Sequence, residues 1–209
     1  EAKADGKYYL DKSGNKVAFQ AGDMRFQDTN GDGKIGEEDR VVIGNPNPDI
    51  YGNISSHLKW KQFALDMAFT YSIGNDIYNY QRSILESGKY FYNQTKAMNS
   101  RWTTEGQVTD IPRLSYQDPH GNSRFSDRWI EDGSYLKLSN ITLSYAIPIN
   151  STFLQGITVW GAVNNVFTIS KYLGSDPDCT ASGNVLLQGI DRGLLGQSRS
   201  FAMGVKVNL

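Results

Sequence analysis

The stretch from Phe63 to Ser72, with the sequence FALDMAFTYS, decides the fold of this chain. Large apolar side chains occupy every second position, and small or polar side chains occupy the positions between them. Because successive side chains of a β-strand point to opposite faces, this strict alternation predicts a strand with one apolar and one polar face.

Other segments of the chain repeat this alternation. Residues 53–60 alternate in the same way, and Lys61-Gln62 leaves room for a tight hairpin turn before the next strand. Alternation returns over residues 157–169 and 200–209. It is also present over residues 136–147, where its phase changes near Ser139-Asn140. Such a phase change predicts a β-bulge, or a strand end that rises above a membrane.

The connections between the expected strands alternate in length. Residues 61–62 and 148–155 are short connections, whereas residues 73–132 and 171–197 are long ones. Outer-membrane barrels join their strands by short periplasmic turns and long extracellular loops. We therefore predict an all-β chain that forms an antiparallel transmembrane β-barrel segment, with the segment before Tyr51 outside the cell. About five strands cannot close a barrel, which needs roughly 8, so a larger sheet is expected. The alternative is a soluble β-sandwich with one buried face.

The composition excludes several classes of protein. The 21 basic and 22 acidic residues nearly balance, which argues against a nucleic-acid partner. No run of about 18 apolar residues exists, so a transmembrane helix is excluded, whereas barrel strands are not. Cys179 is the single cysteine, which rules out an intrachain disulfide. The first residues lack a signal-peptide pattern, so export would need a signal upstream of Glu1.

One segment has the pattern of a calcium-binding loop. Asp28, Asn30 and Asp32 stand at positions 1, 3 and 5 of a twelve-residue loop, and Lys34 at position 7 offers its backbone carbonyl. Asp39 stands at position 12, where glutamate is usual. Calcium takes six to eight oxygen ligands, so this spacing predicts a calcium site. The alternative is an Asx-rich turn without metal.

The calcium loop is expected to hold a loop in place rather than to act as a sensor. Ile35 at position 8 is predicted to anchor it in a small core. No helix pair is predicted on either side, and a calcium sensor needs such a pair to open. His57 and His120, the two histidines, lack the spacing of a zinc site. No nucleophile motif is present, so no enzyme is predicted.

Four segments carry a family resemblance when they are taken together. They are GDMRFQDTNGDGKIGEEDRVVIGNPNPDIYG from Gly22, SYLKLSNITLSYAIP from Ser134, AVNNVFTISKYLGSDPD from Ala162 and GIDRG from Gly189. In this order they resemble the C-terminal part of the SusC/RagA family of TonB-dependent outer-membrane transporters.

The resemblance implies a larger machine. The family is expected to form a 22-stranded barrel closed by a plug. It imports oligosaccharides or peptides across the bacterial outer membrane of Bacteroidetes-type organisms, with energy from the TonB complex and a SusD-like surface lipoprotein as a lid. Residues 1–50 would form an extracellular loop segment with the calcium loop. Residues 51–209 would form the C-terminal strands, which contact outer-membrane lipid and the remainder of the barrel, and their extracellular loops.

The resemblance assigns no substrate-binding residue. The rival interpretation is a secreted calcium-stabilised β-sandwich that binds carbohydrate, and a glycoside hydrolase domain is a weaker third.

Overall fold

The computed structural model describes residues 7–10, 13–149, 153–178 and 187–208. The chain divides into two compact units. We call Glu1–Ile43 with Asn79–Trp129 the loop unit, and Gly44–Tyr78 with Ile130–Leu209 the sheet unit. Neither unit coincides with the segment 1–50 that was expected from the sequence. Each unit is described by itself.

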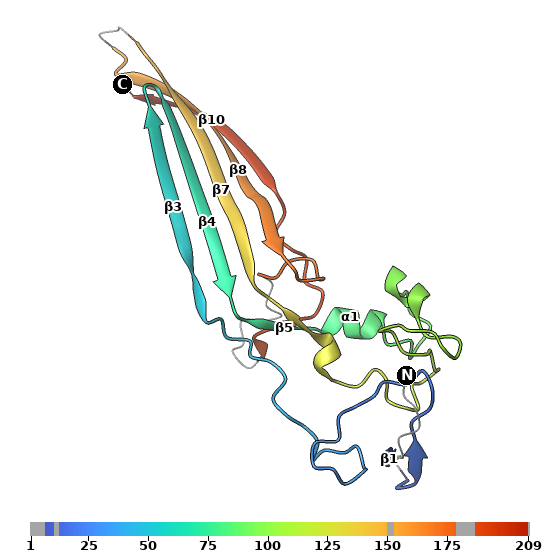
Figure 1. The fold of residues 1–209 in the computed structure, drawn as a ribbon. Coiled ribbons are helices and arrows are strands. Elements are labelled where there is room, and N and C mark those ends of the chain that lie inside the picture. Colours follow the sequence, from blue (N-terminus) through green and yellow to red (C-terminus); the bar gives the residue numbers. More distant parts are fainter. Residues whose placement is uncertain (1–6, 11–12, 150–152, 179–186, 209) are drawn as a thin grey trace. The chain divides into compact units, whose positions relative to one another are not determined.

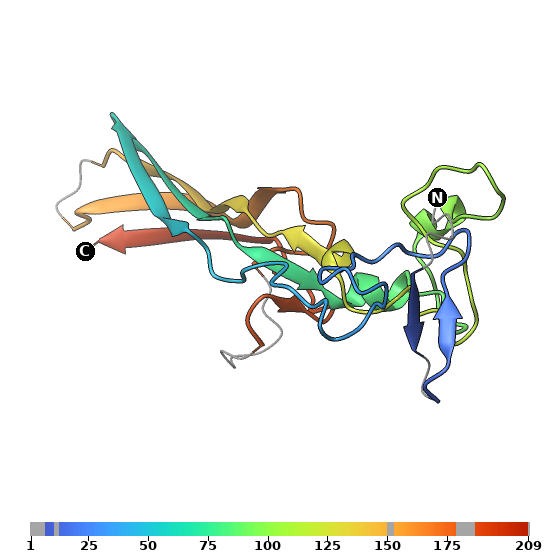
Figure 2. The same ribbon diagram turned by 60° about the horizontal axis from the view of Figure 1, so that its bottom comes forward.

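The sheet unit is built on one five-stranded antiparallel sheet, which we call the main sheet. Its strands lie side by side in the order β10-β8-β7-β4-β3 (Figure 1). The strands are β3 (Ile50–Trp60), β4 (Phe63–Ile73), β7 (Tyr135–Ile147), β8 (Gly156–Ser170) and β10 (Ser200–Asn208). In Figure 2 the teal strand β3 and the red strand β10 run at different angles, which is the twist common to β-sheets. The predicted strands are thus confirmed.

The hairpin of β3 and β4 was predicted from the sequence and is confirmed. The two strands pair without interruption from Trp60 opposite Phe63 to Ile50 opposite Ile73. Lys61 has a φ of 53°, the left-handed conformation that a two-residue hairpin turn requires.

The phase change in β7 is a β-bulge. The register shifts between Leu138 and Asn140 against β8, and the shift against β4 falls at the same place. Ser139 is the extra residue, and its hydroxyl donates to the carbonyl oxygen of Ala68 at 2.8 Å. Because of this insertion, Leu138 and Ile141 lie on the same face of the sheet although three positions separate them.

The long connections of the sheet unit meet in a second, smaller sheet. It has three strands in the order β6-β5-β9. These strands are β5 (Asp76–Asn79), β6 (Ile130–Asp132) and β9 (Ile190–Asp191). β5 and β6 pair antiparallel, and the N–H of Tyr78 donates to the carbonyl oxygen of Gly189 at 2.7 Å. The small sheet therefore fastens the connection between β8 and β10 to the one between β4 and β7.

The loop unit contains short elements around two small clusters. Its elements are β1 (Tyr8–Leu10), β2 (Lys16–Ala18), α1 (Tyr80–Leu85) and two 3-10 helices, η1 (Lys96–Ser100) and η2 (Asp127–Trp129). One cluster is Tyr9, Phe19 and Ile35. The other surrounds Trp129, which is fully buried and has the guanidinium carbons of Arg82 and Arg128 at 5.2 and 4.6 Å from its ring centroid. Among the residues that the structure describes, no helix is long and apolar enough to cross a membrane.

Candidate functional site

The main sheet has two chemically different faces. Direct cross-strand partners share a face, and Met67 pairs with Ile141 while Leu65 pairs with both Leu58 and Leu143. We call this the apolar face; it includes Ile54 and Leu58 on β3, Leu65 and Met67 on β4, Ile141 and Leu143 on β7, Val159 and Val163 on β8, and Phe201 and Met203 on β10.

The apolar face is exposed across the strands of the main sheet. Met203 is 88% exposed and Phe201 is 75% exposed. A continuous apolar surface over five strands is far larger than the scattered patches that soluble monomers present to water. Such a surface is what the outside of a membrane barrel presents to lipid.

Aromatic rings gather where β3 turns into β4. The Trp60 and Phe63 rings stack with centroids 6.4 Å apart, and the Phe63 and Tyr145 rings lie 4.7 Å apart. Tryptophan and tyrosine favour the interface between hydrocarbon and water, and barrels carry a girdle of aromatic residues there. This cluster is therefore consistent with a membrane interface at the hairpin end of the sheet.

The opposite face of the main sheet, which we call the polar face, carries mostly small and hydrogen-bonding side chains. Asn140 donates to Asn164 at 2.8 Å, and His57 lies 2.5 Å from its cross-strand partner Asp66. Side chains of this kind are suited to a water-filled lumen.

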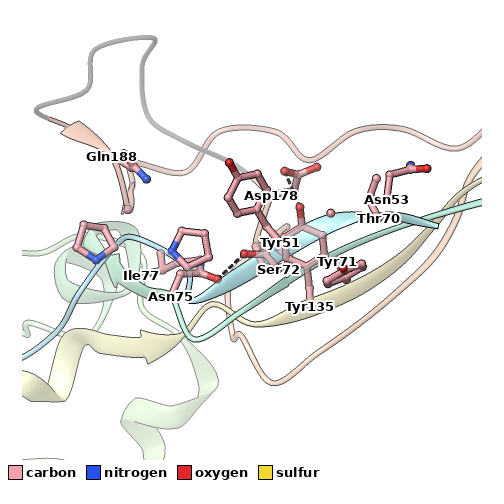
Figure 3. Close-up of a pocket in the computed structure, with 15 residues that line it drawn as sticks. Tyr51, Asn53, Thr70, Tyr71, Ser72, Asn75, Ile77, Tyr135, Asp178 and Gln188 are labelled. Atoms are coloured by element: carbon pink, nitrogen blue, oxygen red, sulfur yellow. Dashed lines mark hydrogen bonds between the residues drawn. The ribbon is translucent and has the colours of Figure 1, made fainter.

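A pocket of about 490 Å³ lies on the polar face, at the end of the main sheet away from the β3–β4 turn (Figure 3). Residues of β3, β4 and β7 form its wall, and the rest comes from the segments before β3 and after β4 and from the connection between β8 and β10. Its lining includes Tyr51, Asn53, Thr70, Ser72, Asn75, Tyr135, Pro177, Asp178 and Gln188. Figure 3 shows Tyr51, Tyr135 and Asp178 close together, with Asn53 and Thr70 towards one end and Gln188 at the other. Aromatic rings beside amides and hydroxyls suit weak stacking and hydrogen-bonding contacts with a polar ligand.

A buried ion pair lies beside this pocket. The ammonium nitrogen of Lys137 is 2.9 Å from a carboxylate oxygen of Asp178 and 3.3 Å from one of Asp176. The Tyr135 hydroxyl donates to the other oxygen of Asp178 at 3.1 Å. Sequence reasoning missed this group, although Lys137 and the two aspartates belong to the segments that carry the family resemblance.

Other contacts fix the remainder of the β8–β10 connection. The Tyr172 hydroxyl donates to the buried carboxylate of Asp191 at 2.5 Å, and the N–H of Gly193 donates to the same carboxylate. The N–H of Leu173 donates to Glu131 at 2.9 Å. The parts of this connection near residues 172 and 191 are therefore held independently of Lys137.

The predicted calcium loop is closed by its own carboxylates. Asp28 accepts from the N–H groups of Gly31 and Gly33 at 2.7 and 2.9 Å. Asp39 accepts from Thr29 and Gly36 at 2.8 and 2.7 Å, which joins the two ends of the loop. The pKa of the Asp39 carboxyl is lowered, chiefly by the hydrogen bond from Gly36 and then by that from Thr29.

The predicted ligands suit calcium by donor type, because each offers an oxygen atom. Asn30 and Asp32 each accept a backbone N–H two residues further on, so their oxygens are already directed into the loop. No three His, Cys, Asp or Glu side chains converge as a metal cluster within residues 7–10, 13–149, 153–178 and 187–208.

The anchoring role predicted for Ile35 is confirmed. Its side chain is 6% exposed in the cluster with Tyr9 and Phe19. Its N–H donates to the carbonyl oxygen of Tyr8 at 2.8 Å, and the N–H of Tyr8 donates to Gly33 at 3.2 Å. The predicted calcium-binding segment is thus joined to β1 by backbone pairing as well as by packing.

The sequence also drew attention to the single cysteine and the two histidines. Cys179 lies outside the described residues. His120 belongs to the loop unit, where its Nδ1 is 3.6 Å from a fully buried oxygen of Asp23. Arg113 and Asn122 hold the same carboxylate at 2.8 and 2.9 Å. This group is a network that ties distant parts of the loop unit together.

The sequence and the structure of this chain were compared with those of known proteins, and the similar ones include TonB-dependent receptors and a peptide transporter. No family model matches the chain. The chain is 31% identical over 193 residues to TonB-dependent receptor P3 of Formosa agariphila, a match that covers 87% of the chain and 18% of that receptor. It is 26% identical over 190 residues to TonB-dependent receptor SusC of Bacteroides thetaiotaomicron, covering 87% and 17%. The structure of the RagAB peptide transporter matches with a TM-score of 0.70 and 25% identity, covering 98% of the chain and 20% of the transporter chain.

The fold and its two faces define a class: the main sheet is a segment of an antiparallel transmembrane β-barrel. The chain is homologous to TonB-dependent receptors of the SusC/RagA kind, which confirms the resemblance drawn from the sequence. It spans about a fifth of the length of these relatives, which are receptors and transporters.

Proposed function

We propose that this chain forms part of the barrel wall and the outer loops of a TonB-dependent nutrient importer in a bacterial outer membrane. The observation that supports this proposal most directly is the main sheet, apolar on one face and polar on the other across five strands. Lipid covers the apolar face, and the polar face lines the path of the nutrient.

The nutrient is an oligosaccharide or a peptide, and the chain catalyses no reaction on it. The pocket offers tyrosine rings, amides and hydroxyls, which suit many weak contacts rather than one tight site. RagAB, whose structure resembles this chain, is a peptide transporter, and this similarity supports a peptide as one of the two candidate nutrients. Transport needs the remainder of the barrel, a plug and the TonB complex, together with a SusD-like lipoprotein that closes over the extracellular loops.

Spin labels on neighbouring residues of β10 test the two-faced assignment. Met203 lies on the apolar face and Ala202 on the polar face. In the full-length protein with Cys179→Ser, in bilayers, a nitroxide at Met203→Cys should collide with dissolved oxygen and be protected from a water-soluble nickel complex. A nitroxide at Ala202→Cys should be accessible to the nickel complex. Protection of the Met203 label from both reagents would indicate a buried core, as in the β-sandwich alternative.

We also propose that Asp28, Asn30, Asp32, Asp39 and the Lys34 carbonyl bind one calcium ion that holds the loop. Calcium that binds the folded loop but not the unfolded one would stabilise the folded loop by mass action. Calcium should protect residues 28–39 from proteolysis, and a chelator should remove that protection.

Asp32→Ala should abolish the calcium-dependent protection. Glu37→Ala is the matched control, because Glu37 lies in the same loop with its side chain 86% exposed and stands at position 10, which supplies no ligand. If residues 28–39 of the unchanged protein are cut equally fast with and without calcium, the proposal is wrong.

A further inference from the structure

Lys137 occupies an unusual place for a lysine. It lies on the polar face of β7 between two threonines, Thr70 on β4 and Thr168 on β8. Its side chain is only 4% exposed. An ammonium group removed from water in this way is costly unless its three donors find acceptors.

Its acceptors come from a single short stretch of the β8–β10 connection. Asp178 lies 2.9 Å from the ammonium nitrogen, and the two oxygens of Asp176 lie 3.3 and 3.4 Å from it. Asp176 also accepts from the N–H of Asp178 at 3.0 Å and from that of Gln197 at 3.3 Å. Asp176 therefore links the part of the connection that follows β8 to the part that precedes β10. Lys137 in turn links Asp176 to strand β7 of the main sheet.

We propose that Lys137 is a positioning residue that docks residues 176–178 on the polar face and thereby completes the pocket. The proposal rests on the proposed function, in which the polar face lines the nutrient path. Pro177 and Asp178 line the pocket together with wall residues such as Tyr51 and Tyr135. The pocket in its present form exists only while this stretch is docked.

The physical argument is one of charge balance. Without the ammonium group, two carboxylates would share a site in which Asp176 is 8% exposed. Removing one member of a buried ion pair is strongly unfavourable, because the remaining charge stays uncompensated. The Asp178 side chain is already 40% exposed. Movement of residues 176–178 into water is therefore the least costly response, whereas backbone pairing of β7 is unaffected.

A fluorescent probe at Pro177 tests the docking directly. In the full-length protein with Cys179→Ser, a bimane on Pro177→Cys would be quenched by the tyrosines of the pocket while the stretch is docked. Lys137→Met removes the charge and keeps the aliphatic stem. It should raise the ratio of displaced to docked forms by at least about tenfold, seen as recovered fluorescence.

The controls separate a charge effect from general damage to the barrel. Lys206→Met removes a lysine from the polar face of β10 and should leave the quenching unchanged. Asp176→Asn with Asp178→Asn should recover fluorescence as Lys137→Met does. The three changes together leave a neutral site of similar volume, so they should restore much of the quenching, a compensation that mere disruption of packing would not produce.

Heat-modifiability on gels reports whether each variant has assembled as a barrel. Unchanged quenching in an assembled Lys137→Met barrel would overturn the inference, and so would a triple variant as fluorescent as Lys137→Met. If Lys137→Met fails to assemble, the variant with Asp176→Asn and Asp178→Asn tests the inference instead, because both of its changes lie outside the strands. Unchanged quenching in that variant would then overturn the inference. A parent protein that forms no barrel would instead contradict the proposed function.

Discussion

Replacing Met67 by arginine should destabilise the assembled barrel far more than the same change at Ala68. Met67 lies on the apolar face opposite Ile141, and Ala68 lies on the polar face opposite Ser55 and Asn140. The two residues are neighbours on one strand, so the comparison isolates the medium that each side chain meets.

The size of the effect follows from the position of Met67 along β4. The strand has 11 residues, and Ala68 is its middle one. With a rise of about 3.4 Å per residue and a tilt of about 40°, such a strand advances roughly 2.6 Å per residue along the membrane normal. Met67 then lies within about 3 Å of the middle of an apolar band about 25 Å tall. Arginine at that depth costs about 2–4 kcal/mol, whereas an arginine directed into a wet lumen should cost about 1 kcal/mol or less.

Urea unfolding of the full-length barrel in lipid vesicles, followed by tryptophan fluorescence, measures both free energies. The expected result is a lower unfolding free energy for Met67→Arg and a nearly unchanged one for Ala68→Arg. Equal losses at the two positions, or a larger loss at Ala68, would refute the assignment of lipid to the apolar face.

Three further changes test other parts of the structure. Gly204→Ala would place a methyl group 2.8 Å from the Trp160 ring, and such overpacking should lower the free energy of unfolding in urea by about 1–3 kcal/mol. Gly161→Ala is the control and should leave that free energy nearly unchanged, because no atom lies within 4 Å of the added methyl group. The pKa of the Asp39 carboxyl is lowered in the folded loop, so the stability that its charge contributes is complete above the ordinary pKa of an aspartate and is lost as pH falls through the lowered one. Pepsin digestion over a series of acidic pH values should therefore cut residues 28–39 faster as pH falls below the ordinary aspartate pKa, and the same rate as in an Asp39→Asn variant at every pH would contradict this. Trp129→Ala removes a fully buried ring and should cost the loop unit about 3–5 kcal/mol, seen as faster hydrogen exchange there while the main sheet stays protected.

The sequence by itself determined the strands and faces of the main sheet. Alternation with a period of two is a local property, because each side chain of a strand points away from its neighbours whatever the strand pairs with. The two-residue hairpin at Lys61 and the bulge at Ser139 could be predicted for the same reason. The hairpin separates two alternating runs, and the bulge changes the phase of the alternation within one run. The anchoring of Ile35 followed from its position in the calcium loop.

Only the tertiary structure decided how the connections fold. Residues 73–132 were expected as one long connection, and the structure shows β5, α1, η1, η2 and β6 within them. These elements are too short for an alternation to show. They are held by contacts between distant residues, such as the Asp23 carboxylate with Arg113 and the Trp129 ring with Arg82.

The pocket and its ion pair depend on the same kind of contact. Lys137 and Asp176 are 39 positions apart, and many other pairs of opposite charge are as close in sequence. Nothing local to either residue specifies which acid a lysine will meet. The pairing of β7 with β8 and the return of the next connection across the polar face bring these residues together, and the low exposure of that site makes the pairing necessary.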